Sequence, residues 1–156
     1  MTGQCARVQA LVEHSVEAVF AADPAAAQRC VGADDEIDRV DVAIEKAAVA
    51  LLSEVASTAI TIPDADLRLI LTIVKVNNEA ERMADLATNI ASEAPAFAAL
   101  QARPPETFRV MANSVIGIVD AARRCFDATD PRIAKVVLNS EDAVERFRRQ
   151  LLRDTE

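Results

Sequence analysis

Aromatic side chains are scarce in this sequence, which has no Trp, no Tyr and only five Phe among its 156 residues. Glycine is rare too, at three residues, although 51% of the chain is hydrophobic. The core must therefore consist mainly of Ala, Val, Leu and Ile, which suits helices packed closely through small side chains. This length is enough to bury the core of one domain, so we expect a single domain over residues 1–156.

Cysteine and histidine are too few for several kinds of chemistry. Cys5, Cys30 and Cys125 are widely spaced and odd in number, which fits neither a disulfide framework nor a CxxC metal motif. They are interpreted as reduced thiols of a cytoplasmic protein. Because His14 is the single histidine, the sequence argues against a Ser-His-Asp triad and against a histidine-rich zinc site. The sequence also has no Gly-rich phosphate loop, and it predicts a protein that is not an enzyme.

Long apolar runs and an excess of basic residues are absent as well. No segment approaches the roughly 18 apolar residues of a membrane span, and the N-terminus does not have the pattern of a signal peptide. The chain carries 25 acidic and 17 basic residues, a net charge of −8. A surface this acidic repels phosphate backbones, so we expect no nucleic-acid partner.

Proline and glycine divide the chain into long segments that show no period-two alternation, so no strand is predicted. We expect an all-α, antiparallel helical bundle, with Gly32 as a candidate kink or break in its second helix. Asp64 and Asp130 have the positions of N-caps, and Pro131 would follow at the first helical position. The five predicted helices cover residues 5–22, 25–59, 64–94, 104–128 and 131–154.

The chain also resembles itself, because the segment 19–40 recurs as 125–147. The helix at 64–94 would recur near 171–201, past residue 156. We therefore expect a three-helix repeat over 5–94, followed by a partial repeat of two helices over 104–155. The main aligned pairs are Asp23 with Asp130, Pro24 with Pro131, Asp34 with Glu141, and Asp38 with Glu145.

Two acidic stripes lie at the margin of the apolar helix faces. On the second helix four carboxylates fall within roughly 40° of one line, beside an apolar sector that includes Ile37 and Ile44. On the third helix the core line of Leu67, Leu71 and Val74 continues into polar residues. The first stripe is Asp34, Asp38, Asp41 and Glu45, and the second is Asn78, Glu81, Asp85 and Asn89.

Like charges at this spacing repel one another, and the repulsion grows near apolar surface, so something is expected to offset it. A bound metal ion is one interpretation, because carboxylates on facing helices can enclose a hard cation. A polar network, with Asn78 and Asn89 as hydrogen-bonding partners, is the other. Oxygen ligands suit Mg, Ca, Mn or clustered Fe(III), and the lack of Glu-x-x-His pairs argues against a ferritin-like di-iron oxidase.

Three segments resemble the PhoU family of phosphate-uptake regulators: A-D-D-E-I-D-R-V at 33–40, D-A-D-L-R-L-I-L at 64–71, and E-A-E-R-M-A-D-L-A-T-N-I-A at 79–91. Members of this family usually carry two three-helix repeats and the signature E/D-x-x-x-D. The resemblance covers about residues 5–155, and its most specific part is Glu81-Arg82 with Asp85 and Asn89. The second repeat would be incomplete in this chain.

The resemblance implies a nonenzymatic cytosolic adaptor that represses the phosphate-starvation response. It would link a phosphate ABC transporter to a sensor histidine kinase, and it would meet the membrane only through these partners. Some family members bind iron or zinc clusters through their acidic motifs, so iron, zinc or magnesium is the expected metal. The implied ligands are Asp34, Asp38, Glu81 and Asp85; Glu141 and Glu145 match in the second repeat, where the partner helix is absent.

An acidic bundle that buffers or stores metal ions is the alternative function, and an enzyme is the weakest hypothesis. The last two helices carry apolar residues that need cover, including Val110, Ile116, Phe126, Val136 and Phe147. We therefore predict a homodimer in which these two helices pack against their symmetry mates. A compact five-helix monomer is the competing outcome.

Overall fold

The computed structural model describes residues 1–58, 61–128 and 130–154, without the side chains of Glu141 and Asp154. These residues form six helices and no strand, which confirms the all-α prediction. The helices are α1 (Thr2–Ala21), α2 (Pro24–Thr58), α3 (Asp64–Ala91), α4 (Ala94–Leu100), α5 (Glu106–Ala128) and α6 (Pro131–Asp154).

The five long helices match the predicted ones to within three residues at each end, apart from residue 59, which lies outside the described residues, and the short α4 was not predicted. It spans 7 residues, too few to show a helical period, and it ends at Gln101 in the left-handed region with φ 51°. The candidate break at Gly32 is wrong, since α2 is continuous over its 35 residues. Gly32 is exposed, and a Cβ at this position would meet nothing within 4 Å, so the glycine makes no turn or close approach.

Aspartates start two helices at matching positions of the internal repeat. One carboxylate oxygen of Asp23 accepts hydrogen bonds from the backbone N–H groups of Ala25 (2.9 Å) and Ala26 (3.0 Å). Asp130 accepts one from the N–H of Arg132 at 2.9 Å, which confirms it as a cap. Asp64 is not a cap, because Pro63 has that position and Asp64 lies in the first turn, where the helix dipole favours a negative charge.

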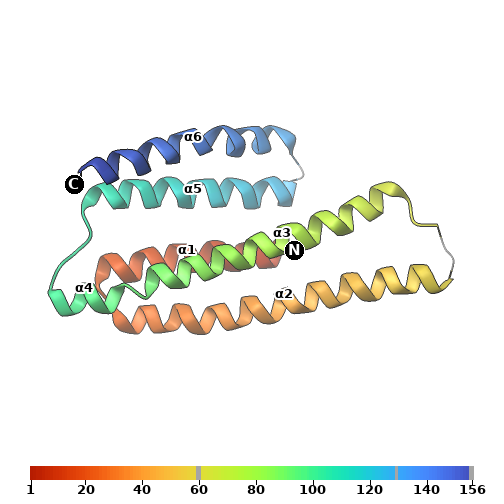
Figure 1. Cartoon of the computed structure of the whole chain (residues 1–156), viewed down its shortest axis with the longest axis horizontal. Helices are drawn as coiled ribbons and strands as arrows, with labels where there is room; N and C mark the ends of the chain where they lie inside the picture. The colour runs from red at the N-terminus through yellow and green to blue at the C-terminus, as the bar shows by residue number, and fades with distance from the viewer. Residues whose placement is uncertain (59–60, 129, 155–156) are drawn as a thin grey trace.

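The first three helices form one antiparallel unit, and the α5–α6 pair lies alongside it (Figure 1). Within the unit α1 packs against both α2 and α3, and α2 packs along α3. The second pair is joined to the unit through the contact of α5 with α1, while α6 packs on α5. The α2–α3 hairpin extends past the end of α1 (Figure 1).

Small side chains line the centre of the three-helix unit. Ala80, Ala84, Ala87 and Ala91 of α3 are each at most 1% exposed. They pack in one cluster with residues of α1 and α2 that include Leu11 and Ile37. The predicted core line of Leu67, Leu71 and Val74 is therefore only partly correct: Leu67 and Val74 are half-buried, whereas Leu71 is 50% exposed.

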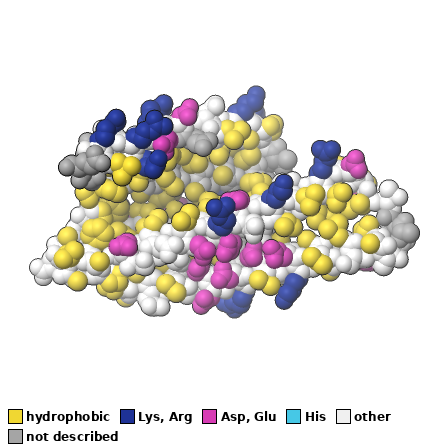
Figure 2. Space-filling view, in the orientation of Figure 1, with side chains coloured by type: hydrophobic (Ala, Val, Ile, Leu, Met, Phe, Trp, Pro, Cys, Tyr) yellow, Lys and Arg dark blue, Asp and Glu magenta, His cyan; other side chains and the backbone are white. Residues whose placement is uncertain are grey.

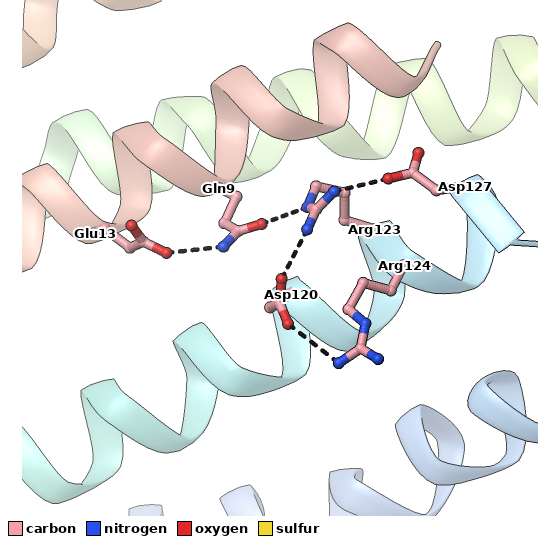
Figure 3. A network of polar contacts seen from close by, with 6 residues as sticks. All are labelled: Gln9, Glu13, Asp120, Arg123, Arg124 and Asp127. Atoms are coloured by element: carbon pink, nitrogen blue, oxygen red, sulfur yellow. Dashed lines mark hydrogen bonds and ion pairs between the residues drawn. The ribbon is translucent and has the colours of Figure 1, made fainter.

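A polar network attaches α5 to α1 (Figure 3). The Nε–H of Arg123 donates to Oε1 of Gln9 at 2.7 Å, and the Gln9 amide in turn donates to Glu13 at 2.8 Å. The same guanidinium reaches Asp120 at 3.0 Å and Asp127 at 2.7 Å on its own helix. Together with the ion pair of Arg109 with Glu17 at 2.8 Å, this network holds the second pair against the first unit, and the sequence did not reveal it. None of the described helices is long and apolar enough to cross a membrane.

Replacing Ala84 by Leu tests the alanine contact. The added side chain has no room at a position that is 0% exposed, so Ala84→Leu is expected to lower the free energy of unfolding by about 1–3 kcal/mol. Ala43→Leu, at an exposed position of α2, is the matched control and is expected to change little. Urea unfolding followed by far-UV circular dichroism measures both, and equal stability of the two variants would contradict a tightly packed interface.

Candidate functional site

The packing of α2 along α3 brings the two acidic stripes together. Asp34, Asp38 and Asp41 of α2 and Glu81 and Asp85 of α3 act on one another through their charges. Figure 2 shows acidic side chains gathered over α2 and α3 in the middle of the displayed face. We call these five residues the acidic face. The structure thus brings the four predicted ligands Asp34, Asp38, Glu81 and Asp85 to one place.

The Asp34 carboxyl group is the most strongly perturbed group of the acidic face. Burial first, and then the charges of Asp38, Asp85 and Asp35, raise its pKa from 3.8 to about 6. Its Oδ1 atom is buried and has no hydrogen-bond partner. A buried oxygen without a donor is costly, and a negative charge there costs more. Asp34 is therefore the point where a cation or a proton would relieve the most unfavourable energy.

Two further carboxyl groups of the acidic face share this environment. Burial, followed by the neighbouring carboxylates, raises the pKa of Asp41, where the neighbours are Glu45 and Asp38. Burial also raises the pKa of Glu81. The charges that raise it further belong to Asp85, Asp41, Asp38 and Asp34. Every charged group that shifts these three pKa values is itself a carboxylate, so the repulsion is shared across both helices.

Asn77, which the sequence reasoning missed, forms the polar contact between the two helices. It is 0% exposed, and its Nδ2 donates to Oδ1 of Asp41 at 2.7 Å and to the backbone carbonyl of Asp41 at 3.2 Å. Its spacing of three residues from Ala80 and seven from Ala84 places it on the buried alanine stripe, and this signal could have identified it. Asn78 and Asn89, the hydrogen-bonding partners expected from the sequence, are both exposed.

The polar-network interpretation thus accounts for Asp41 but not for Asp34. Asp41 has a donor from α3, whereas the buried oxygen of Asp34 has none. Asp38, Glu45 and Asp85 are exposed, and Glu81 is half-buried.

As a metal centre, the acidic face has suitable donors but no closed coordination shell. Carboxylate oxygens suit a hard cation, and the buried Asp34 Oδ1, which has no hydrogen-bond donor, fits such a ligand. Across the side chains that the structure describes, however, no three His, Cys, Asp or Glu groups converge tightly enough to hold an ion. A bound cation would have to draw the carboxylates of α2 and α3 together.

The second acidic motif is in a different electrostatic state. Glu145 forms ion pairs with Arg148 at 2.8 Å and Arg149 at 3.0 Å. Hydrogen bonds from these two guanidinium groups lower its pKa to about 2. The side chain of its predicted companion, Glu141, lies outside the described residues. Arginines therefore neutralise Glu145, while its repeat counterpart Asp38 belongs to a face of uncompensated carboxylates.

Comparison with known proteins gives a consistent result at three levels. The family model described as the PhoU domain matches residues 4–94. The chain is 30% identical over 149 residues to the phosphate-specific transport system accessory protein PhoU homolog of Aquifex aeolicus, covering 94% of this chain and 65% of that protein. It is 30% identical over 151 residues to the PhoU homolog 1 of Mycobacterium tuberculosis, covering 95% and 66%.

The fold is similar to a solved structure over almost its whole length. The crystal structure of PhoU from Pseudomonas aeruginosa superposes with a TM-score of 0.88 at 28% identity, covering 97% of this chain and 71% of that chain. The chain spans 65% and 66% of the length of the two curated relatives above.

The raised pKa of Asp34 predicts that removing its negative charge stabilises the protein, by an amount that depends on pH. At pH 7 the ionised carboxylate is destabilising, so Asp34→Asn is expected to raise the free energy of unfolding by roughly 1 kcal/mol after solvent screening. Because the pKa is raised from 3.8 to about 6, the folded state binds more protons than the unfolded state between these values. The stability of the unmodified protein therefore rises as pH falls through 6, and the advantage of the variant disappears below about pH 4.

Thermal melts from pH 4 to 8 in chelator measure this difference. Glu54→Gln, which changes an exposed carboxylate of the same helix, is the control and should show no such trend. A stability difference between Asp34→Asn and the unmodified chain that is the same at pH 4 and pH 7 would contradict the assignment.

Proposed function

Because the chain belongs to the PhoU family, we propose that it is a cytoplasmic adaptor that regulates phosphate uptake and phosphate-starvation signalling. Its proposed partners are a phosphate ABC transporter and a sensor histidine kinase. The observation that carries this proposal is the match to the solved PhoU fold over 97% of the chain. The relatives are accessory proteins of phosphate-specific transport systems by name, which supports the transporter as a partner.

The chemistry of the described side chains supports action by binding rather than by catalysis. Each Ser or Thr hydroxyl with an assigned hydrogen bond donates it to a backbone carbonyl of its own helix, as Thr72 does to Arg68 at 2.8 Å. The Cys125 thiol likewise lies 3.6 Å from the carbonyl oxygen of Asp130. A nucleophile needs a base within reach, and these groups are directed at the backbone instead.

The acidic face is proposed to bind a metal ion as part of this function. Asp34, Asp38, Glu81 and Asp85 would hold the ion between α2 and α3, and its positive charge would offset their repulsion. Iron, zinc or magnesium is the proposed metal. Since the ligands come from both helices, binding would stiffen the α2–α3 pair against separation.

We also propose that the functional form is a homodimer. Apolar side chains of α5 and α6 remain accessible: Val110 is 51% exposed, Phe126 41% and Val136 60%. Ile116, in contrast, packs against the core of the first unit and needs no partner. Large apolar residues that stay accessible at several places on one helix pair support a protein contact there.

Affinity purification from membranes tests the adaptor function. The tagged full chain, incubated with membranes of phosphate-replete cells, is expected to retain the phosphate ABC transporter and the sensor kinase. Deleting the gene is expected to raise phosphate uptake in phosphate-replete medium, and the full chain should restore normal uptake. Retention of neither protein, together with unchanged uptake in the deletion strain, would contradict the proposal.

Metal-dependent melting tests the acidic face. The unmodified protein is expected to gain thermal stability with a cation that binds it, by about 2.7 kcal/mol at a hundred times the dissociation constant, and to lose it in chelator. Asp85→Asn should abolish most of this gain while keeping its helicity, and Glu54→Gln should keep the full gain. The polar network would be favoured if the protein is purified without metal and its melting temperature does not change with Mg²⁺, Mn²⁺, Zn²⁺, Fe³⁺ or chelator.

The number of ions bound separates the adaptor from a metal store. One or a few ions per chain fit a regulatory site on the acidic face. Loading of many ions per chain, with no retention of the transporter, would favour the storage bundle instead.

A further inference from the structure

The helix at the edge of the structure, α6, differs in charge from the rest of the chain. It packs on α5, and Figure 1 shows it on the side of the molecule opposite α2. It contains six basic and four acidic residues, whereas α2 contains three basic and seven acidic ones. Among the six described helices, α6 alone has more basic than acidic residues. Positive and negative charge therefore gather on opposite sides of a chain whose net charge is −8.

Basic side chains lie on the side of α6 that faces away from α5. On the inner side, Val144 lines a hollow against α5, and Leu151 is 7% exposed. Arg146 and Arg153 follow these two residues by two positions each, which places them about 160° away around the helix. Both arginines are exposed, and the exposed Lys135 lies on the same line. Among the described side chains these three cations form no ion pair, so their charge is available to a partner.

Exposed leucines accompany the arginines of α6. Leu152 is 55% exposed, and it follows Arg148 by four residues and Arg149 by three, so it lies between them on the helix surface. Both arginines are exposed, although each also pairs with Glu145. Leu138, which is 72% exposed, lies on the line of Arg149. Leucines among arginines suit a helix that rests on a membrane, since the leucine can enter the acyl boundary while the guanidinium groups bind headgroups.

The shape of this basic surface favours a flat partner. The hollows beside α6 are lined by residues such as Phe147 and Val144, and none of the basic residues of α6 lines them. Lys135 and Arg153 are eighteen residues apart, so the basic row extends over roughly 27 Å of helix. Asp142 interrupts it, but residues 146–153 contain four arginines and no acidic residue. Figure 2 shows basic side chains gathered over this part of α6. A convex row of cations fits a plane of phosphate groups better than a peptide or small ligand, which binds in a groove.

The acidic residues of α2 are too distant to prevent such a contact. In Figure 1 the helices α5 and α1 lie between α6 and α2. Packed helices lie about 8–10 Å apart, and charges are screened over about 8 Å at physiological ionic strength. An anionic surface at α6 would therefore meet the arginines directly, while its repulsion of the α2 carboxylates would be largely screened.

We propose that α6 docks directly on a membrane surface that contains anionic phospholipids. Arg146, Arg149 and Arg153 bind the phosphate groups, and Leu152 enters the boundary between headgroups and acyl chains. The resemblance to the PhoU family implies contact with a membrane only through partner proteins, so this direct contact goes beyond the proposed function. Val136, an apolar residue of the proposed dimer contact, lies about 80° from Arg146 around the helix and is not needed for docking.

Sedimentation with lipid vesicles tests the contact in the full chain. The unmodified protein is expected to bind vesicles of equal parts phosphatidylglycerol and phosphatidylcholine, but not phosphatidylcholine alone, and to dissociate as salt is raised. Arg146→Gln combined with Arg153→Gln should lower the partition coefficient about 25-fold, roughly fivefold for each basic residue lost. Lys46→Gln combined with Arg68→Gln, exposed on α2 and α3, is the control with the same net charge and should bind like the unmodified protein.

A single tryptophan tests the orientation of α6 independently. Because the chain contains no Trp and no Tyr, Leu152→Trp introduces a unique indole. Its emission is expected to shift to shorter wavelength with phosphatidylglycerol vesicles, since the indole enters the headgroup boundary. Val42→Trp, at a position of α2 that is 45% exposed, should keep the emission of an indole in water. All substituted side chains are exposed, and far-UV circular dichroism checks that each variant is folded.

Separate results would overturn the membrane contact and its assignment to α6. No binding to phosphatidylglycerol vesicles would overturn the contact, and binding of polyglutamate instead would assign this surface to an acidic protein segment. Equal loss of binding in the two double variants would show an effect of net charge alone and overturn the assignment to α6. An unshifted Leu152→Trp emission in vesicle-bound protein would overturn it too. None of these results contradicts the proposed adaptor function, because the vesicles contain neither transporter nor kinase.

Discussion

The alanine stripe of α3 is the contact on which the other features of the structure depend. Ala80, Ala84, Ala87 and Ala91 let α3 approach α1 and α2 closely, and this approach fixes the rotation of α3 about its axis. The same rotation turns Glu81 and Asp85 towards the carboxylates of α2, and turns Met83 towards α5 and α6. The packing of the α3 alanines against α1 and α2 thus determines both the acidic face and the apolar side of α3 that faces α5 and α6.

Carboxylates at matching positions of the two repeats have different electrostatic environments. In the first, Asp34 and Asp38 are surrounded by further carboxylates, and the pKa of Asp34 is raised. In the second, Arg148 and Arg149 neutralise Glu145. Uncompensated charge is therefore concentrated on α2 and α3, where cation binding would act directly on helix packing. Such coupling would give a physical route from a bound ion to the surface of the proposed adaptor.

The sequence predicted the helices well because caps and breakers are local signals. The Asp130 cap and the helical period of the long segments can be recognised from neighbouring residues alone. The short α4 has too few residues to show such a period. Helical spacing placed the four central carboxylates in the two acidic stripes, and the resemblance to the PhoU family singled them out as the implied ligands. Asn77 was missed because Leu67 and Leu71 suggest a different buried line from the one that the alanines of α3 form in the structure. The Arg123 network depends on a contact between α5 and α1 that no local pattern records.

Titration of the Asp34 carboxyl group tests the central claim, that the acidic face holds uncompensated charge which a cation relieves. Carbon-detected NMR of side-chain carboxyl groups can follow Asp34 across pH with and without added cation. In chelator its pKa should be about 6, and a saturating cation should lower it clearly because the ion favours the charged form. An Asp34 that titrates near 3.8 in chelator and does not respond to any cation would contradict the account.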